Sequence, residues 1–264
     1  MGHRHHRRFF VPPADIREGW VAFSAAQAHQ IRHVLRLRPG EGVIVFDGTG
    51  REIEAALDGG PGALRARVRR ERRAAAAGPR ILLAQVLPRG AAMDQIVQQA
   101  TELGAAALVP LLAERSVRQA VERAPRWARI MREAAEQCGR ADLPALHAPL
   151  PLGQFLAALA PDSPLVVCAP EAGQGLLAAA RAVAGASRVT LLVGAEGGLS
   201  DAETRQLQGR GALFASLGPH LLRTPTAALA ALAVLQAGLS AWGAAEAGER
   251  LPGEPSDGEH PHRG

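Results

Sequence analysis

The chain contains no lysine, no asparagine and no tyrosine, and only two of its 264 residues are cysteines. Two cysteines, Cys138 and Cys168, cannot build the disulfide framework of a small secreted domain, and no cluster of metal ligands accompanies them. Aromatic residues make up 3% of the chain, so its core must consist largely of alanine, leucine and valine. The low cysteine content is typical of the reducing cytosol, and we expect a cytoplasmic protein without a metal.

Long hydrophobic runs are missing as well. The longest apolar stretches are too short or too interrupted to cross a membrane, and no signal-peptide pattern is present. The chain also lacks a G-x-G-x-x-G fingerprint, a P-loop and a nucleophile elbow. These absences argue against a membrane protein, a dehydrogenase, a P-loop NTPase and an α/β-hydrolase.

Basic charge is concentrated in the N-terminal third of the chain. All 30 basic residues are arginines, and residues 1–80 hold 15 of them against 8 acidic residues, a net charge of +7. Residues 81–264 hold the other 15 arginines against 17 acidic residues, a net charge of −2. Because phosphate neutralisation supplies much of the affinity of nucleic-acid binders, this division favours a docking module joined to a catalytic one. An arginine-rich genome is the alternative explanation.

Short strands separated by tight turns are predicted over residues 1–75. The apolar run that starts at Arg8 indicates an edge strand, and further strands are predicted at 43–46, 52–57 and 64–69. In the strand at 64–69, arginines alternate with smaller residues and therefore lie on one face. This face either binds the phosphate backbone of a nucleic acid or is the solvated outer face. The pattern predicts a small β-barrel, followed at 74–78 by an alanine-rich linker where we place a domain boundary.

A capped amphipathic helix is predicted at residues 24–37. Its core-facing positions are Ala28, Ile31 and either Val34 or Leu35. Its outward face is basic and is formed by His29, Arg32, His33 and Arg36. The two histidines have the spacing of a zinc-binding pair, but no Glu or Cys ligand accompanies them, so we favour a basic exposed face.

From residue 81 onward, apolar strands alternate with amphipathic helices. Strands are predicted at 81–87, 108–112 and 165–168, and helices at 93–103 and 127–138. This alternation is typical of a parallel sheet that is covered on both faces.

The most informative stretch runs from Arg188 to Gln236. A buried strand at 189–193 leads into a glycine-rich turn and then a capping box, Ser200 with Glu203. A second strand at 211–217 leads into a loop and a helix that begins at Thr224-Pro225 and is apolar all round. Two glycine-bearing loops at the carboxyl ends of neighbouring parallel strands predict a ligand crevice.

The motifs VGAEGGLS (193–200) and LGPHLLRTPTAALAAL (217–232) resemble the C-terminal signature of the SPOUT-superfamily methyltransferases. Within that superfamily the chain is most similar to the bacterial 16S ribosomal RNA (uracil-N(3))-methyltransferase family, whose usual pattern is V-G-P-E-G-G followed by L-G-x-R-I-L-R-x-E-T-A. The segments MDQIVQQATELG (93–104), ERS (114–116) and EAAEQCGR (133–140) resemble further family motifs, so the resemblance spans residues 8–242. The chain departs from the pattern at Ala195, His220 and Pro225, where proline, arginine and glutamate are usual.

The resemblance implies an α/β fold in which a trefoil-knotted, parallel-sheet methyltransferase domain, 78–242, follows a PUA-like β-barrel, 1–75, that docks RNA. The remaining residues, 243–264, are rich in glycine, proline and acids, and are predicted to be disordered. The resemblance further implies S-adenosylmethionine as cofactor and 16S ribosomal RNA of the small subunit as partner. We also expect a homodimer, because the apolar helix after Pro225 and the helix at 127–138 offer surfaces to bury between subunits.

By resemblance, the cofactor lies among three loops, 169–175, 194–199 and 217–227. The predicted cofactor-binding residues are Gly194, Glu196, Gly197, Gly198, Leu217, Gly218, Leu222, Arg223, Thr226 and Ala227. The predicted RNA-binding residues of the N-terminal third are Arg8, His33, Arg36 and Arg38.

The implied chemistry places one demand on the site. Ring nitrogen 3 of uracil holds a proton, so a base or groups that stabilise the resulting anion must assist methyl transfer. Glu114 and Glu196 are the candidate bases, and Arg115 and Arg223 are candidate anion stabilisers or phosphate clamps. Alternatively, Glu196 only orders its glycine loop, and Arg223 only neutralises the cofactor carboxylate.

Two alternative functions are a ribose 2′-O-methyltransferase and a non-catalytic RNA-binding factor. A SPOUT ribose 2′-O-methyltransferase usually carries an N-E-x-x-R motif, which a chain without asparagine cannot have in that form. A non-catalytic RNA-binding factor of ribosome assembly would explain the departures at Ala195, His220 and Pro225.

Overall fold

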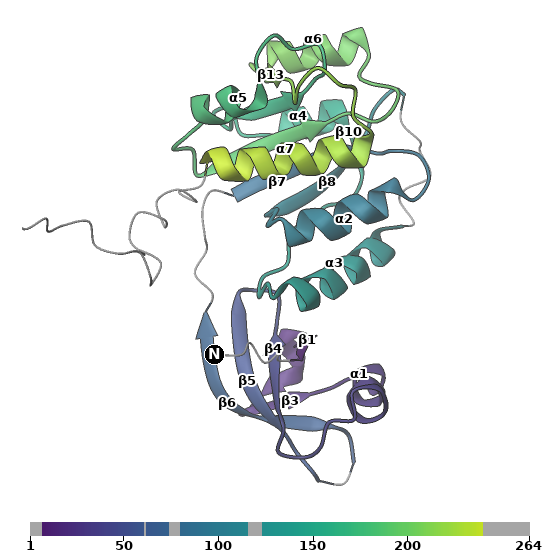
Figure 1. Ribbon diagram of the computed structural model, residues 1–264, viewed down its shortest axis with the longest axis vertical. Helices are drawn as coiled ribbons and strands as arrows, with labels where there is room; N and C mark the ends of the chain where they lie inside the picture. Colours follow the sequence, from purple (N-terminus) through teal and green to yellow (C-terminus); the bar gives the residue numbers. More distant parts are fainter. Residues whose placement is uncertain (1–6, 61, 74–79, 116–122, 240–264) are drawn as a thin grey trace, which may run out of the picture.

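The computed structural model describes residues 7–60, 62–73, 80–115 and 123–239 (Figure 1). The predicted linker at 74–78, the predicted tail at 243–264 and the leader before residue 7 lie outside these residues. Within the described ranges, no helix is long and apolar enough to cross a membrane.

The N-terminal part forms a six-stranded sheet in the order β1-β4-β5-β6-β3-β2. Its strands are β1 (Arg8–Phe10), β2 (Ile16–Arg17), β3 (Trp20–Ala22), β4 (Gly42–Phe46), β5 (Arg51–Leu57) and β6 (Arg65–Arg73). The edge position predicted for the first strand is confirmed. Because β1 and β2 end the order without pairing with each other, the predicted barrel is a half-barrel.

The alternation predicted along β6 is also confirmed. Arg65 and Arg67 are exposed, whereas Ala66 between them is fully buried. Both guanidinium groups lie over the ring of Trp20 on the neighbouring strand β3, at 4.2 and 5.7 Å from its centroid. The arginine face of this strand is therefore the outer face of the half-barrel.

The predicted helix at 24–37 is shorter than expected. Ser24 caps α1 (Ala25–His29) in a capping box with Gln27, and a π-helical turn, Gln30–Val34, follows directly. A π turn inserts one extra residue and so rotates the helix face. Of the two alternatives left open by the sequence, Leu35 packs on the core with Ala28 and Ile31, and Val34 is 65% exposed.

The C-terminal part is an all-parallel sheet in the order β10-β8-β7-β12-β11-β13, with β9 paired to β8. Its strands are β7 (Arg80–Val86), β8 (Ala107–Leu112), β9 (Ala145–Leu146), β10 (Leu150–Pro151), β11 (Leu165–Cys168), β12 (Arg188–Val193) and β13 (Leu213–Ala215). The predicted parallel sheet is confirmed, although β9 and β10 were not foreseen.

Helices cover both faces of this sheet. One face is covered by α2 (Ala92–Glu102), α3 (Ala124–Cys138), α5 (Leu176–Ala182) and α7 (Thr224–Leu239). The other is covered by α4 (Leu152–Ala158) and α6 (Asp201–Gly209). Although β13 is an edge strand, α7 after it packs on β7 and β12 at the centre. The knot implied by the resemblance would form where the chain makes this return.

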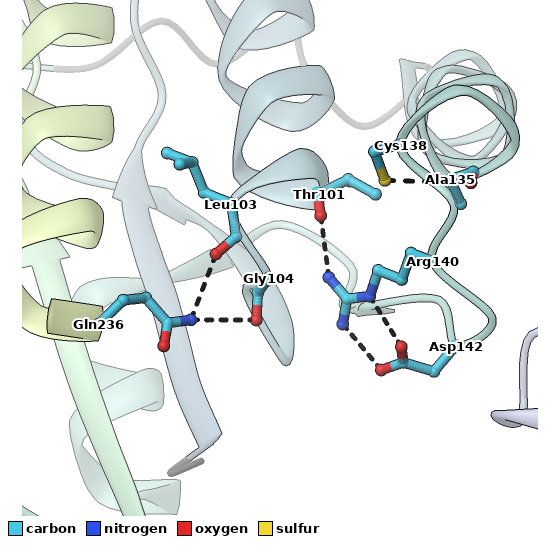
Figure 2. A network of polar contacts seen from close by, with 8 residues as sticks. All are labelled: Thr101, Leu103, Gly104, Ala135, Cys138, Arg140, Asp142 and Gln236. Carbon is cyan, nitrogen blue, oxygen red and sulfur yellow. Dashed lines mark hydrogen bonds and ion pairs between the residues drawn. The ribbon is translucent and has the colours of Figure 1, made fainter. Parts of the chain in front are cut away.

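Polar contacts fix the ends of α2, α3 and α7 to one another (Figure 2). The Gln236 side-chain amide on α7 donates to the carbonyl oxygens of Leu103 and Gly104, which follow α2, at 3.3 Å each. Arg140, just after α3, donates to the Thr101 carbonyl at 3.0 Å and forms a bidentate ion pair with Asp142. These contacts tie the carboxyl end of α7 to the end of α2, and the end of α2 to the segment that follows α3.

The half-barrel contacts the parallel-sheet part through α3. The main-chain N–H of Phe10 donates to the Glu136 carboxylate at 2.8 Å, and burial raises the pKa of that carboxyl. Arg8 pairs with Glu52 and also donates to the Arg140 carbonyl at 3.3 Å. Burial alone would raise the pKa of Glu52, but hydrogen bonds from Arg8 and Arg72 lower it.

Candidate functional site

A cavity of about 830 Å³ opens at the carboxyl ends of β11, β12 and β13. Most of its lining comes from residues within three segments, 168–172, 193–199 and 214–227, and Arg115 and Thr204 complete it. The structure thus brings the three predicted loops together around one space. The capping box predicted at Ser200 is present, with Ser200 accepting from the main-chain N–H of Glu203 at 3.3 Å, so the second segment is held at the start of α6.

Nearly all of the predicted cofactor-binding residues line this cavity. They are Gly194, Glu196, Gly197, Gly198, Leu217, Gly218, Leu222, Arg223 and Ala227. Thr226 is not part of the lining and is exposed on the first turn of α7. Helix geometry explains this, because Ala227 and Thr226 are successive residues and point to different sides of α7.

Two of the glycines have backbone conformations that side chains rarely adopt. Gly198 has φ of +66° and Gly218 has φ of +130°, both in the left-handed half of the map. A Cβ atom built at either position would meet no other atom within 4 Å. Both residues line the cavity, and the space beside each is open.

Main-chain N–H groups of the β12–α6 loop are free to bind a ligand. Within the described ranges, the N–H groups of Gly194, Ala195, Glu196 and Gly197 have no hydrogen-bond acceptor, whereas that of Gly198 donates to the Ala195 carbonyl at 2.9 Å. Successive free N–H groups in a loop form a concave site that favours hydrogen-bond acceptors and negative charge.

Neighbouring loops hold this glycine loop in place. Gln85, near the end of β7, donates from its side chain to the Val193 and Gly194 carbonyls, both at 3.2 Å. On the other side, the Arg115 guanidinium donates to the Gly197 carbonyl at 3.1 Å. Glu203 of α6 also accepts the main-chain N–H of Glu114 at 2.8 Å.

The four predicted catalytic residues are not equivalent in the structure. Arg115, Glu196 and Arg223 line the cavity, and all three are exposed. Glu196 accepts a long hydrogen bond, 3.4 Å, from the main-chain N–H of Arg89. Glu114 is exposed but lies outside the lining, so the structure brings three of the four candidates together.

Three of the four predicted RNA-binding residues are exposed, and the fourth, Arg8, is largely buried. His33, Arg36 and Arg38 are exposed on and after the π-helical turn that follows α1, and α1 lies on the opposite side of the half-barrel from β6 (Figure 1). Arg36 has φ of +52°, a strained value for a residue with a side chain. The Arg8 side chain is only 13% exposed and pairs with Glu52, so we leave it out of the proposed RNA surface.

Sequence reasoning missed several residues around the cavity. Cys168, Thr204 and Phe214 line it, and burial raises the pKa of the Cys168 thiol, which keeps the thiol protonated. Gln85 lies behind it, and its signal was a polar residue inside an otherwise apolar strand. Among the residues that the structure describes, no group of three or more His, Cys, Asp or Glu could hold a metal ion.

Both parts of the chain match known families. Residues 76–236 match a family described as an RNA methyltransferase domain, and residues 23–68 match an RNA methyltransferase PUA domain. The ribosomal RNA small subunit methyltransferase E of Synechocystis is 35% identical over 236 residues, 87% of this chain and 77% of that protein. Its Mycobacterium bovis counterpart is 34% identical over 80% of this chain and 84% of that protein.

Solved structures agree with these matches. The Neisseria gonorrhoeae ribosomal RNA small subunit methyltransferase E, bound to S-adenosylmethionine, has a TM-score of 0.80 at 27% identity, covering 90% of this chain and all of that one. A putative methyltransferase of Legionella pneumophila, also in complex with that cofactor, has a TM-score of 0.77 at 32% identity. It covers 88% of this chain and 97% of that one.

Proposed function

This chain belongs to the ribosomal RNA small subunit methyltransferase E family, and we propose that it methylates ring nitrogen 3 of a uridine in 16S ribosomal RNA with S-adenosylmethionine. The observation that carries the proposal is that sequence and fold match these enzymes over both parts of the chain. A cytoplasmic site of action follows from the ribosomal substrate.

The cavity fits the cofactor in size and in the groups that it presents. Its volume of about 830 Å³ lies in the range of small-molecule sites. Free N–H groups of residues 194–197 suit a carboxylate or the acceptor nitrogens of an adenine ring. S-adenosylmethionine supplies a methyl group on a positively charged sulfur, which an attacking nitrogen can take.

The residues of the cavity must deal with the proton on ring nitrogen 3 of the uracil. We propose that Arg223 stabilises the negative charge that spreads over the flanking carbonyl oxygens once that proton leaves. In the part of the chain that the structure describes, its guanidinium has no carboxylate partner. Arg115 is already bound to the Gly197 carbonyl, and its first role is to hold the glycine loop.

Glu196 is the remaining candidate base, since Glu114 lies outside the cavity lining. A base must come within hydrogen-bond reach of the proton that it removes, and Glu196 is the candidate carboxylate that lines the same space as Arg223. Positioning the uracil against the methyl group supplies a further part of the rate.

The test of the proposed function is methyl transfer to small ribosomal subunits that lack this modification. We expect labelled methyl groups from S-adenosylmethionine to enter 16S ribosomal RNA when the purified chain is added. A ribosome-assembly factor that has lost catalytic activity would bind the particles without transferring methyl groups. For such a factor, calorimetry would show no heat of S-adenosylmethionine binding.

We further propose that the α1 surface, defined as His33, Arg36 and Arg38, docks the RNA, while residues 78–242 hold the cofactor. Changing Arg36 and Arg38 together to alanine should weaken RNA binding and lower the salt slope of log affinity by about two, one for each lost phosphate contact. Affinity for S-adenosylmethionine should not change. Filter binding across a salt series measures the first effect, and calorimetry the second.

The matched control for this pair is Arg80→Ala with Arg188→Ala. These two exposed arginines lie side by side at the amino ends of β7 and β12, at the sheet edge opposite the cavity. The control removes the same charge and should leave RNA binding nearly unchanged. An equal loss in both double variants would mean that only net charge matters and that the α1 surface is not a docking site.

We also propose a homodimer that buries the apolar surface of α7 and α5. Leu177 of α5 is 46% exposed, and α5 packs directly on α7, which is apolar over its whole length. Light scattering at micromolar concentration should give twice the chain mass of 27.6 kDa. Leu177→Asp should give a monomer, and Val34→Asp, at an apolar residue 65% exposed in the other part, should not. A monomeric wild type would contradict the proposal.

A further inference from the structure

Gln85 is fully buried near the carboxyl end of β7, next to Val193 of β12. Its side-chain N–H₂ group donates to three main-chain carbonyl oxygens, those of Val86 at 2.8 Å and of Val193 and Gly194 at 3.2 Å. Its own carbonyl oxygen is buried and, across the described residues, has no hydrogen-bond partner.

This arrangement satisfies three main-chain carbonyls but leaves one buried acceptor unpaired. An unpaired buried acceptor destabilises a protein, and an apolar side chain of the same length would remove it. What glutamine supplies here, and an apolar residue would not, is a donor aimed at the Gly194 carbonyl. That carbonyl belongs to the first peptide bond after β12, where the glycine loop begins.

The direction of one carbonyl fixes the direction of the next N–H group. Peptide bonds are planar, and none in the described residues is cis, so the Gly194 carbonyl and the Ala195 N–H point in opposite directions. Gln85 draws the carbonyl inward to β7, and the Ala195 N–H therefore points away from β7. Ala195 lines the cavity, and its N–H has no acceptor in the described structure.

We propose that Gln85 is a positioning residue of the cavity, which turns the peptide bond between Gly194 and Ala195 so that the Ala195 N–H donates to the bound ligand. The inference rests on the proposed function, in which the ligand is S-adenosylmethionine and the acceptor is its carboxylate or an adenine nitrogen. Proline, usual in the family at this position, has no N–H, so Ala195 gives this chain a donor that the usual sequence lacks.

The first test compares Gln85→Met with the wild type. Methionine has a similar length and no donor. It removes the unpaired oxygen but also the hydrogen bonds to the Val86, Val193 and Gly194 carbonyls, so the melting temperature should fall modestly while the protein stays folded. Affinity for S-adenosylmethionine, measured by calorimetry, should fall roughly three- to tenfold, the value of one hydrogen bond. Gln95→Met, at an exposed glutamine of α2, is the control and should leave both quantities unchanged.

A double-mutant cycle then asks whether Gln85 acts through the Ala195 N–H. Ala195→Pro removes that N–H and should lower affinity by a similar factor. In the Ala195→Pro background, Gln85→Met should cause no further loss, because the group that it positions is gone. Losses that multiply, or a Gln85→Met variant with wild-type affinity, would overturn the proposal.

Hydrogen exchange gives a readout that does not depend on the proline variant. Followed by NMR, the Ala195 amide should become protected when S-adenosylmethionine is added to the wild type, and much less protected in Gln85→Met. An Ala195 amide that exchanges equally fast with and without the cofactor would overturn the proposal. A wild type that binds no S-adenosylmethionine at all would instead contradict the proposed function.

Discussion

Replacing Gly198 with valine is expected to abolish S-adenosylmethionine binding, with affinity lower by at least about a hundredfold. Two effects act together. Its φ of +66° is unfavourable for a β-branched residue, so the loop must change shape. The valine side chain would also occupy space that now belongs to the cavity, since no atom lies within 4 Å of the added Cβ. Calorimetry measures the loss directly.

Gly211→Val is the matched control for this prediction. Gly211 has a similar φ of +76° and equally open surroundings, but it lies outside the cavity lining. Its substitution carries the same backbone strain and should lower the melting temperature while cofactor affinity persists. Retained affinity in a well-folded Gly198→Val protein would show that the ligand lies elsewhere.

Replacing Arg223 with leucine is expected to lower the rate of methyl transfer by about a hundred- to a thousandfold. That is the size of effect found when a group that stabilises developing negative charge is removed. Cofactor affinity should change only a few-fold, because the charge in question arises on the uracil. Single-turnover transfer to small subunits at saturating cofactor measures the rate, and calorimetry measures the affinity.

Arg205→Leu serves as its control, at an exposed arginine of α6 outside the cavity lining. It should leave the rate unchanged. If Arg223→Leu lowers cofactor affinity as much as the rate, Arg223 neutralises the cofactor carboxylate and has no separate role in the chemistry.

Local patterns in the sequence were enough to predict the two glycine-bearing loops, whereas the third loop, 169–175, came from the family resemblance. Ser200 and Glu203 are three residues apart, and a capping box needs nothing beyond that spacing. The second contact of Glu203, with the main-chain N–H of Glu114, joins residues 89 positions apart and has no local signature. It depends on β8 and β12 being two strands apart in the same sheet.

The N-terminal part shows where composition misleads. Its charge predicts a basic surface, and His33, Arg36 and Arg38 are indeed exposed. Arg8 is equally basic, yet its side chain is largely buried. It pairs with Glu52 of β5 and donates to the carbonyl of Arg140, just after α3. A count of charged residues predicts the sign of a surface charge. It does not predict which arginines are paired with carboxylates and buried.

Helix periodicity predicted the faces of residues 24–37 but not the π turn at Gln30–Val34. The predicted inward positions Ala28 and Ile31 pack on the core as expected, and of the two alternatives Val34 and Leu35 it is Leu35 that does so. The sequence shows Gln85 as a polar residue within the apolar run of β7. Its hydrogen bonds to the Val193 and Gly194 carbonyls could not be predicted, because they depend on the pairing of β7 with β12.

The central claim is that this chain methylates ring nitrogen 3 of a uridine in 16S ribosomal RNA. The most direct measurement is mass spectrometry of nucleosides from small subunits lacking the modification, after incubation with the purified chain and S-adenosylmethionine. We expect 3-methyluridine to appear with the wild type, and not with Gly198→Val. The appearance of 2′-O-methyluridine or another methylated nucleoside in its place, or of none, would contradict it.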